Sequence, residues 1–216
     1  MEPNSQQNED TKERILEEAE RLFAHKGYRG VSVREITQAA GVNSAAVNYH
    51  FGSKKNLYLE VFRARWIPRG KRVAQMSEAA MASAPSSARN VLKAITQAFL
   101  DTFASDDECR RHYQLASREL SQPSEALALI MNEVMKPNME GFLRAMGPYL
   151  PANLPRENAM LYAYTVVGVL MHFIVGRAVI SKLTGRQYDD QFRQVIEDHI
   201  IDFCLHGILG SNRKAV

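Results

Sequence analysis

The chain has 216 residues and a net charge of +3, with 45% hydrophobic and 24% charged residues. This composition argues against a disordered chain and leaves room for a buried core, in one domain or in a small domain and a larger one. The cysteines Cys109 and Cys204 lie far apart and outside any metal-ligand spacing. We therefore expect no disulfide framework and a reducing, cytoplasmic location.

Positive charge is concentrated in one block of the sequence. Residues 26–72 contain ten lysines and arginines against two acids, Glu35 and Glu60, which gives a net charge of +8. The residues after 72 contain 14 basic and 15 acidic side chains. Such a block is typical of a surface that faces a polyanion, although a solvated basic helix face produces the same pattern.

The most apolar stretch, from Leu161 to Ile180, is interrupted by His172 and Arg177. We interpret it as a buried or interface helix and expect no membrane span. The first ten residues are polar and do not form a signal peptide.

Apolar residues recur with helical spacing throughout, and no run alternates as a strand would, so we predict an all-α fold of about nine helices. The first begins near Asp10, which caps it together with Glu13, and ends at Gly27. The second is short, begins after Ser32 and ends at Gly41.

Two more helices complete the N-terminal part. Asn43 caps one over about residues 44–51, and Ser53 caps the other, which Pro68 ends or kinks. A small-residue connection at 79–88 is followed by five helical patterns, over about residues 87–104, 106–121, 124–146, 155–183 and 189–209. We predict an N-terminal domain over residues 1–66 and a C-terminal domain over residues 67–216, with Tyr58, Phe62 and Trp66 packing against the latter.

The segment from Ser32 to Phe51 is the most informative. Its two short helices cannot bury their own apolar faces, so they need the first helix as a support. The resulting three-helix cluster presents the third helix outward. This arrangement is a helix-turn-helix, whose second helix enters the major groove of DNA.

The side chains around the third helix suit DNA in three ways. Small residues let the helix approach base edges, hydrogen-bonding residues can read those edges, and polar-tipped aromatics with a lysine can bind phosphate oxygens. The small residues are Ala45 and Ala46, and the hydrogen-bonding residues are Ser44 and Asn48. The phosphate-binding candidates are Tyr49, His50 and Lys54.

The stretch VSVREITQAAGVNSAAVNYHFGSKKNLYLEVF resembles the DNA-binding domain of the TetR repressor family over about residues 11–65. The cap, the Gly-Val turn, Tyr-His-Phe, Ser-Lys and Leu-Tyr are all in register. The resemblance implies contacts of Ser32 and Arg34 with DNA backbone or a groove edge. With Asn43 included, the predicted DNA-binding set is Ser32, Arg34, Asn43, Ser44, Ala45, Ala46, Asn48, Tyr49, His50 and Lys54.

One position departs from the family. Where the family often has tyrosine, this chain has Asn48. Asparagine can pair with adenine through two hydrogen bonds, so we hypothesise that Asn48 reads a base where tyrosine usually serves a phosphate.

The resemblance also implies a C-terminal helical domain for effector binding and dimerisation. The last helix has a wide apolar stripe and the one before it is apolar nearly all round, which favours a two-fold, four-helix interface between subunits. The predicted interface residues are Val167, Leu170, Ile174, Phe192, Val195, Ile196, His199 and Phe203. Candidate effector-binding residues are Phe99, Phe103, Tyr113, Arg118, Met135, Met139, Phe142, Tyr162, Met171 and His172, most of which fit a core equally well.

Together with the resemblance, these patterns predict a homodimeric transcriptional regulator that binds a palindromic double-stranded DNA operator and is released by a small, partly apolar effector. An activator and a repressor that requires its ligand remain alternatives, with a non-specific DNA-binding protein as a remote one. We find no phosphate loop, nucleophile elbow or metal-binding motif, so we expect no catalytic residues, metal or cofactor.

Overall fold

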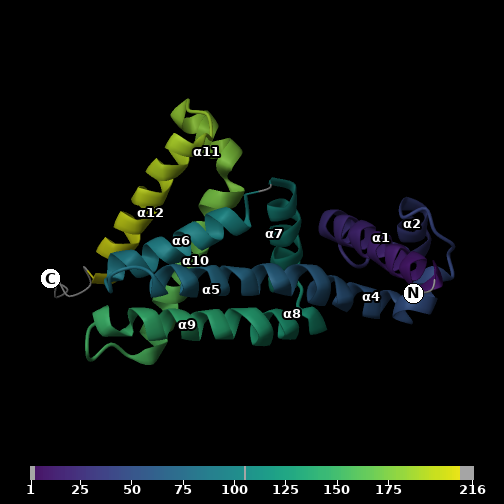
Figure 1. Cartoon of the computed structure of the whole chain (residues 1–216), viewed down its shortest axis with the longest axis horizontal. Helices are drawn as coiled ribbons and strands as arrows, with labels where there is room; N and C mark the ends of the chain where they lie inside the picture. Colours follow the sequence, from purple (N-terminus) through teal and green to yellow (C-terminus); the bar gives the residue numbers. More distant parts are fainter. Residues whose placement is uncertain (1–2, 105, 210–216) are drawn as a thin grey trace. The chain divides into compact units, whose positions relative to one another are not determined.

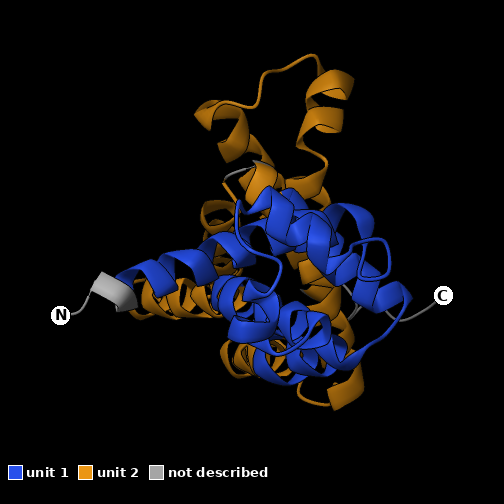
Figure 2. Ribbon diagram, turned by 90° about the vertical axis from the view of Figure 1, so that its right-hand side faces the viewer, with its two compact units in different colours: residues 1–69, 110–134 blue, residues 70–109, 135–216 orange. Residues whose placement is uncertain are grey.

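A computed structural model describes residues 3–104 and 106–209, and within these ranges all regular structure is helical. The chain forms two compact units (Figure 2). Unit 1 consists of residues 1–69 and 110–134, and unit 2 of residues 70–109 and 135–216. Unit 1 thus joins the beginning of the chain with a segment that comes much later in the sequence.

The helices of unit 1 are α1 (Pro3–Lys26), α2 (Val33–Ala39), α3 (Ala46–Phe51), α4 (Lys54–Val61), the π-helical segment η1 (Phe62–Trp66), most of α7 (Asp106–Ser121), α8 (Glu125–Ile130) and most of the π-helical segment η2 (Met131–Met135). Figure 1 labels most of these helices, among them α1, α2, α4, α7 and α8. The start of α5 (Ile67–Ala82) also belongs to unit 1.

Helix α1 begins seven residues earlier than the sequence predicts. It starts at Pro3, a residue that fits the first turn because its missing N–H has no partner there in any helix. Asp10 lies within the helix and forms an ion pair with Arg14 one turn later, at 3.4 Å, so it does not serve as the predicted cap.

The apolar stripes predicted for the first four helices form the core of unit 1. The buried residues come from every helix of the N-terminal cluster: Ile15, Leu16, Ala19, Leu22, Phe23, Ile36, Val47, Phe51, Leu57 and Val61. Tyr58, Phe62 and Trp66 are buried in the same unit, against α1 and α7. Tyr58 and Trp66 thus contact Glu119 and His112, which lie within the predicted C-terminal domain of residues 67–216, as expected for these two side chains. The difference is that this part of α7 belongs to unit 1.

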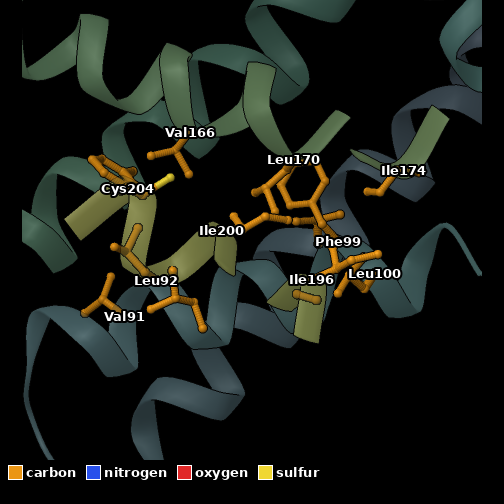
Figure 3. Packing of buried hydrophobic residues seen from close by; sticks show 14 of the residues in the cluster. Val91, Leu92, Phe99, Leu100, Val166, Leu170, Ile174, Ile196, Ile200 and Cys204 are labelled. Atoms are coloured by element: carbon orange, nitrogen blue, oxygen red, sulfur yellow. The ribbon is translucent and has the colours of Figure 1, made fainter. Parts of the chain in front are cut away.

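Unit 2 contains the rest of α5 and five further α-helices. They are α6 (Ala88–Thr102), α9 (Lys136–Met146), α10 (Arg156–Val175), α11 (Arg177–Thr184) and α12 (Asp190–Leu209), with a 3-10 turn η3 (Gly147–Tyr149). The core lies where α6 meets α10 and α12, and Figure 3 shows Phe99, Leu170 and Ile200 directed toward one another.

Two features of unit 2 differ from the sequence prediction. The predicted helix over 155–183 is divided at Gly176, where an added Cβ would lie only 2.7 Å from the carbonyl oxygen of His172. Counting runs joined by π-turns as one, the described residues form ten helices where about nine were expected. The predicted inter-domain connection at 79–88 is a turn inside unit 2, between α5 and α6.

Pro68 and Pro137 lie within helical runs without ending them. Each follows a π-helical segment by two residues, and the N–H of Ile67 donates to the carbonyl of Phe62 five residues back. In an α-helix, a proline ring clashes with the carbonyl four residues earlier. Here those carbonyls belong to Ala64 and Glu133, inside the wider π-turns, so the helix continues.

One helix of the described residues, α10, is long and apolar enough to cross a membrane by length and composition. Four of its residues, Ala163, Val166, Leu170 and Ile174, are buried in the core of unit 2. A core helix of a soluble protein has the same composition, so this criterion is weak evidence for a span.

Candidate nucleic-acid interface and C-terminal surfaces

The start of α2 is fixed by a capping box. The hydroxyl of Ser32 accepts a hydrogen bond from the N–H of Glu35 at 3.1 Å, and the Glu35 carboxylate accepts one from the N–H of Ser32 at 3.5 Å. The Glu35 carboxylate also accepts a hydrogen bond from Lys26, which lowers its pKa, with a smaller contribution from Ser32. These bonds place Arg34, exposed on the first turn of α2, at a fixed point of the surface.

The turn into α3 is tighter than predicted. The α-helix begins at Ala46 instead of Ser44, and the side-chain oxygen of Asn43 accepts a hydrogen bond from the N–H of Ala45 at 2.8 Å. Asn43 therefore holds the turn before the helix. Gly41 adopts a φ of 64°, the left-handed conformation that a helix-ending glycine was expected to supply.

Helix α3 has one buried side and one exposed side. Val47 and Phe51 are buried, whereas Asn48 and Tyr49 are exposed, and Tyr49 keeps 76% of its surface accessible. A six-residue helix needs this anchorage, since alone it would not be stable. Its outward side chains are available to a ligand as large as DNA.

Lys54 stands at the first turn of α4. Ser53 caps this helix by accepting a hydrogen bond from the N–H of Asn56 at 3.1 Å. The Lys54 ammonium lies over the ring of Tyr28, 4.3 Å from its centroid, and partial burial lowers its pKa. The helix N-terminus and the cation together favour an anion at this point.

Most of the other cations in the basic block form ion pairs within unit 1. The pairs are Lys26–Glu35, Lys55–Glu125, Arg63–Glu60, Arg65–Glu13 and Arg69–Glu20. Among the described residues, Arg34 and Lys54 have no carboxylate partner. Arg29, in the turn before α2, and Arg72, on α5, also lack a carboxylate partner among the described residues. Three of these four cations therefore lie around α2 and α4, which the count along the sequence does not reveal.

All ten predicted DNA-binding residues lie in this part of unit 1. Seven are exposed: Ser32, Arg34, Asn43, Ser44, Ala45, Asn48 and Tyr49. Ala46, His50 and Lys54 are partly buried. Their individual contacts with DNA stay predictions.

The ten candidate effector-binding residues are not brought together as one set. Six contribute to the interior of unit 2, on α6, α9 and α10: Phe99, Phe103, Met139, Phe142, Tyr162 and Met171. Tyr113 and Arg118 belong to unit 1, and His172 is exposed. Met135 is half-buried at the beginning of the second segment of unit 2.

The predicted dimer residues fall into two groups on α10 and α12. Leu170, Ile174, Phe192 and Ile196 are buried in the core of their own unit and face α6, so they cannot contact a second copy. Val167 is partly buried, and Val195, His199 and Phe203 are exposed.

The outward sides of α10 and α12 form an open groove with a volume of about 560 Å³. Its lining is mainly apolar and aromatic and includes Tyr164, Gly168, His172, Phe173, His199 and Phe203. Four of the eight predicted interface residues are thus buried within unit 2, and the interface on α10 and α12 stays a prediction.

Sequence reasoning missed the role of α7. Arg118, predicted to bind an effector, donates hydrogen bonds to the carbonyls of Ala24 and His25, and Glu119 accepts one from the hydroxyl of Tyr58. These partners lie 61 to 94 residues apart along the chain, and no local pattern signals such contacts.

Residues 15–61 match the family described as "Bacterial regulatory proteins, tetR family", and residues 88–208 match the C-terminal domain of the HTH-type transcriptional dual regulator CecR. The dual regulator CecR of Shigella flexneri is 26% identical over 93% of each chain. The repressor AcnR of Corynebacterium glutamicum is 43% identical over 54 residues, 25% of this chain and 29% of its own.

Solved structures show the same fold. A bacterial regulatory protein of the tetR family from Rhodococcus RHA1 superposes with a TM-score of 0.66 at 17% identity, over 92% of this chain and 96% of its own. The second family match alone spans more than half of the chain. The chain therefore belongs to the TetR family of DNA-binding transcriptional regulators, with a C-terminal domain of the CecR type.

Proposed function

We propose that this regulator is a repressor that binds a palindromic operator as a homodimer and leaves it when a small, partly apolar molecule binds unit 2. One observation carries the DNA part of the proposal. The exposed side of α3 is flanked by Arg34 and Lys54, two basic residues that have no carboxylate partner among the described residues. Such cations bind phosphates and position the helix, whose side chains then read bases.

Asn48 is the residue we propose for base recognition. It is exposed on α3, one turn after the small residues Ser44 and Ala45. Its amide can form a donor–acceptor pair with an adenine edge. Replacement by alanine is expected to change which operator bases matter, whereas a phosphate contact would be lost equally on all sequences.

A second copy of this chain is the proposed occupant of the α10–α12 groove. Regulators of this family are typically dimers. Pairing α10 and α12 with the same helices of another subunit would cover Tyr164, Val195 and Phe203, which otherwise expose large apolar surfaces. A two-fold dimer also presents two α3 helices to half-sites of a palindrome.

The interior of unit 2 supports an effector that is mostly apolar. Phenylalanine and methionine side chains from α6, α9 and α10 meet there, and methionine adapts to ligands of different shape. An effector that prefers the dimer state with low DNA affinity must lower operator occupancy by linkage. We propose a cytoplasmic location, because the operator DNA of a bacterial regulator lies there.

A regulator that also activates transcription is the second candidate. The relative from Shigella flexneri, similar over nearly its full length, is named a dual regulator. The same DNA-binding surface serves activation when the operator lies where bound protein favours the polymerase. Reporter assays with the operator placed at its natural position distinguish the two signs of regulation.

The deciding experiment selects bound fragments of the source genome and titrates the best one by gel shift at two salt concentrations. We expect tight binding to a few palindromic fragments and weaker, more salt-dependent binding to the rest. Weak binding to every fragment, with and without candidate effectors, would contradict a sequence-specific regulator.

A further inference from the structure

We propose that the last turn of α7 is a working part of the DNA-binding surface, in which Arg118 and Glu119 are positioning residues for the Lys54 ammonium. The inference rests on the proposed phosphate contact of Lys54. It adds two residues that lie more than 60 positions away in the sequence and outside the helix-turn-helix.

Arg118 holds the end of α1. Its Nε donates to the carbonyl of Ala24 at 3.1 Å, and its terminal nitrogen donates to the carbonyl of His25 at 2.7 Å. The last carbonyls of a helix have no partners within the helix and carry the negative end of its dipole, so a guanidinium there satisfies both. Gly27 follows with a φ of 75°, and an added Cβ would lie 3.0 Å from the Arg118 guanidinium. The guanidinium therefore lies directly against the turn that leads into Tyr28.

Glu119 holds the other side of the same region. Its side chain is 2% exposed, and one carboxylate oxygen accepts a hydrogen bond from the Tyr58 hydroxyl at 2.7 Å. The other oxygen accepts bonds from the N–H and the hydroxyl of Ser124, at 2.9 and 2.8 Å. A buried carboxylate that accepts three hydrogen bonds is fixed in place, and the Tyr58 hydroxyl that donates one of them is fixed with it.

Tyr28 connects these anchors to the lysine. Its ring centroid lies 5.1 Å from that of Tyr58 and 6.1 Å from that of Phe23, and the Lys54 ammonium rests on it. A cation over an aromatic face is attracted by the ring and gives up part of its freedom. The position of the Tyr28 ring thus decides where the ammonium lies, and Arg118 and Glu119 fix that ring from two sides.

Helix α7 contains residues of both units. Cys109, in its first turn, is buried in the core of unit 2, whereas the turns from Arg110 onward belong to unit 1. Arg118 and Glu119 lie in the part of α7 that belongs to unit 1, together with Tyr28 and Lys54.

The test compares Arg118→Met, Arg118→Lys and Glu119→Gln with Lys54→Met in the full-length protein. Proton–carbon NMR of lysine side chains reports the ring-current shift of Lys54, with Lys55 as the internal reference. Binding to a mixed-sequence duplex is measured as a function of salt. We expect the three variants to move the Lys54 signal toward that of Lys55 and to lower the salt slope by about 0.9 for each Lys54 contact that is lost.

Glu140→Gln is the matched control, because it removes an exposed ion pair with Arg156 in unit 2 and leaves Tyr28, Tyr58 and Lys55 untouched. It should change neither reading for Lys54. An unchanged Lys54 signal and salt slope in both Arg118 variants, with the helical content retained, would overturn the proposal. If Arg118→Met does not fold, Arg118→Lys and Glu119→Gln decide. If Lys54→Met leaves the salt slope unchanged, Lys54 does not contact a phosphate and that part of the proposed function is wrong. The NMR shift still tests whether Arg118 and Glu119 position the Lys54 ammonium.

Discussion

Replacement of His112 by phenylalanine should remove a large part of the acid sensitivity of unit 1. The imidazole stacks on the indole of Trp66, with centroids 4.4 Å apart and planes 6° from parallel, and the Trp66 N–H donates to the His112 carbonyl at 3.1 Å. Burial, and then the positive charge of Arg69, lower the pKa of His112 to about 3. The folded protein therefore keeps this imidazole neutral at pH values where an unfolded chain would protonate it.

The sign and size of the effect follow from this difference. An unfolded histidine has a pKa of about 6.5, so between that value and the folded pKa the unfolded state binds the additional proton. The contribution of His112 to the free energy of unfolding is fully present above this window and is lost as the pH falls through it. Since one pH unit of the window corresponds to about 1.4 kcal/mol, the loss amounts to about 3 kcal/mol by about pH 4.

The assay is urea unfolding of wild type and His112→Phe between about pH 7 and about pH 4. Phenylalanine keeps an aromatic ring on Trp66 but cannot titrate, so its stability should fall much less over this range. His25→Gln, a change at an exposed histidine of α1, should follow wild type. Parallel loss of stability in wild type and His112→Phe would refute the assignment of the acid sensitivity to this stack.

Three further changes test other parts of the structure. Phe203→Glu, at a side chain 60% exposed in the groove, should convert the dimer to monomers in sedimentation equilibrium, whereas Leu120→Glu, 56% exposed on α7, should not. Burial raises the pKa of Glu197, so its charged form is a cost at neutral pH that vanishes as the pH falls through the raised pKa. Glu197→Gln should therefore raise the melting temperature near pH 7 and lose this advantage below the ordinary glutamate pKa; an advantage that is constant with pH would contradict the reasoning. Gly27→Ala should destabilise by about 1–2 kcal/mol in urea unfolding because of its positive φ, whereas Gly207→Ala, with open space around the added methyl, should be neutral or stabilising.

The sequence sufficed for features that local chemistry determines. The capping box at Ser32, the cap at Ser53 and the left-handed glycines that end the short helices follow from residues within one turn of each other. The position of each apolar stripe likewise predicted which side of α3 and α4 is buried. These are the features that define the candidate DNA-binding surface.

Features that depend on distant partners were not predictable. Periodicity showed that α10 and α12 have apolar residues on several sides, but not which side meets α6 and which faces outward. Leu170 and Ile196, which are buried in the core of unit 2, were therefore placed in the predicted dimer interface. Arg118 looked like a polar group for an effector because a lone arginine in sequence gives no sign of helix carbonyls 93 positions away. The π-turns were also missed, because nothing but the following proline marks them.

The return of residues 110–134 to unit 1 has a consequence for engineered chimeras that join the DNA-binding domain of one regulator to the effector-binding domain of another. A single cut after residue 69 would separate the helix-turn-helix from Arg118 and Glu119 and would divide the Trp66–His112 stack. A transplant that keeps these contacts needs three junctions, after residues 69, 109 and 134. The first junction falls in the first turn of α5, directly after η1, and the third falls within η2, so both interrupt a continuous helical run at or beside a π-turn.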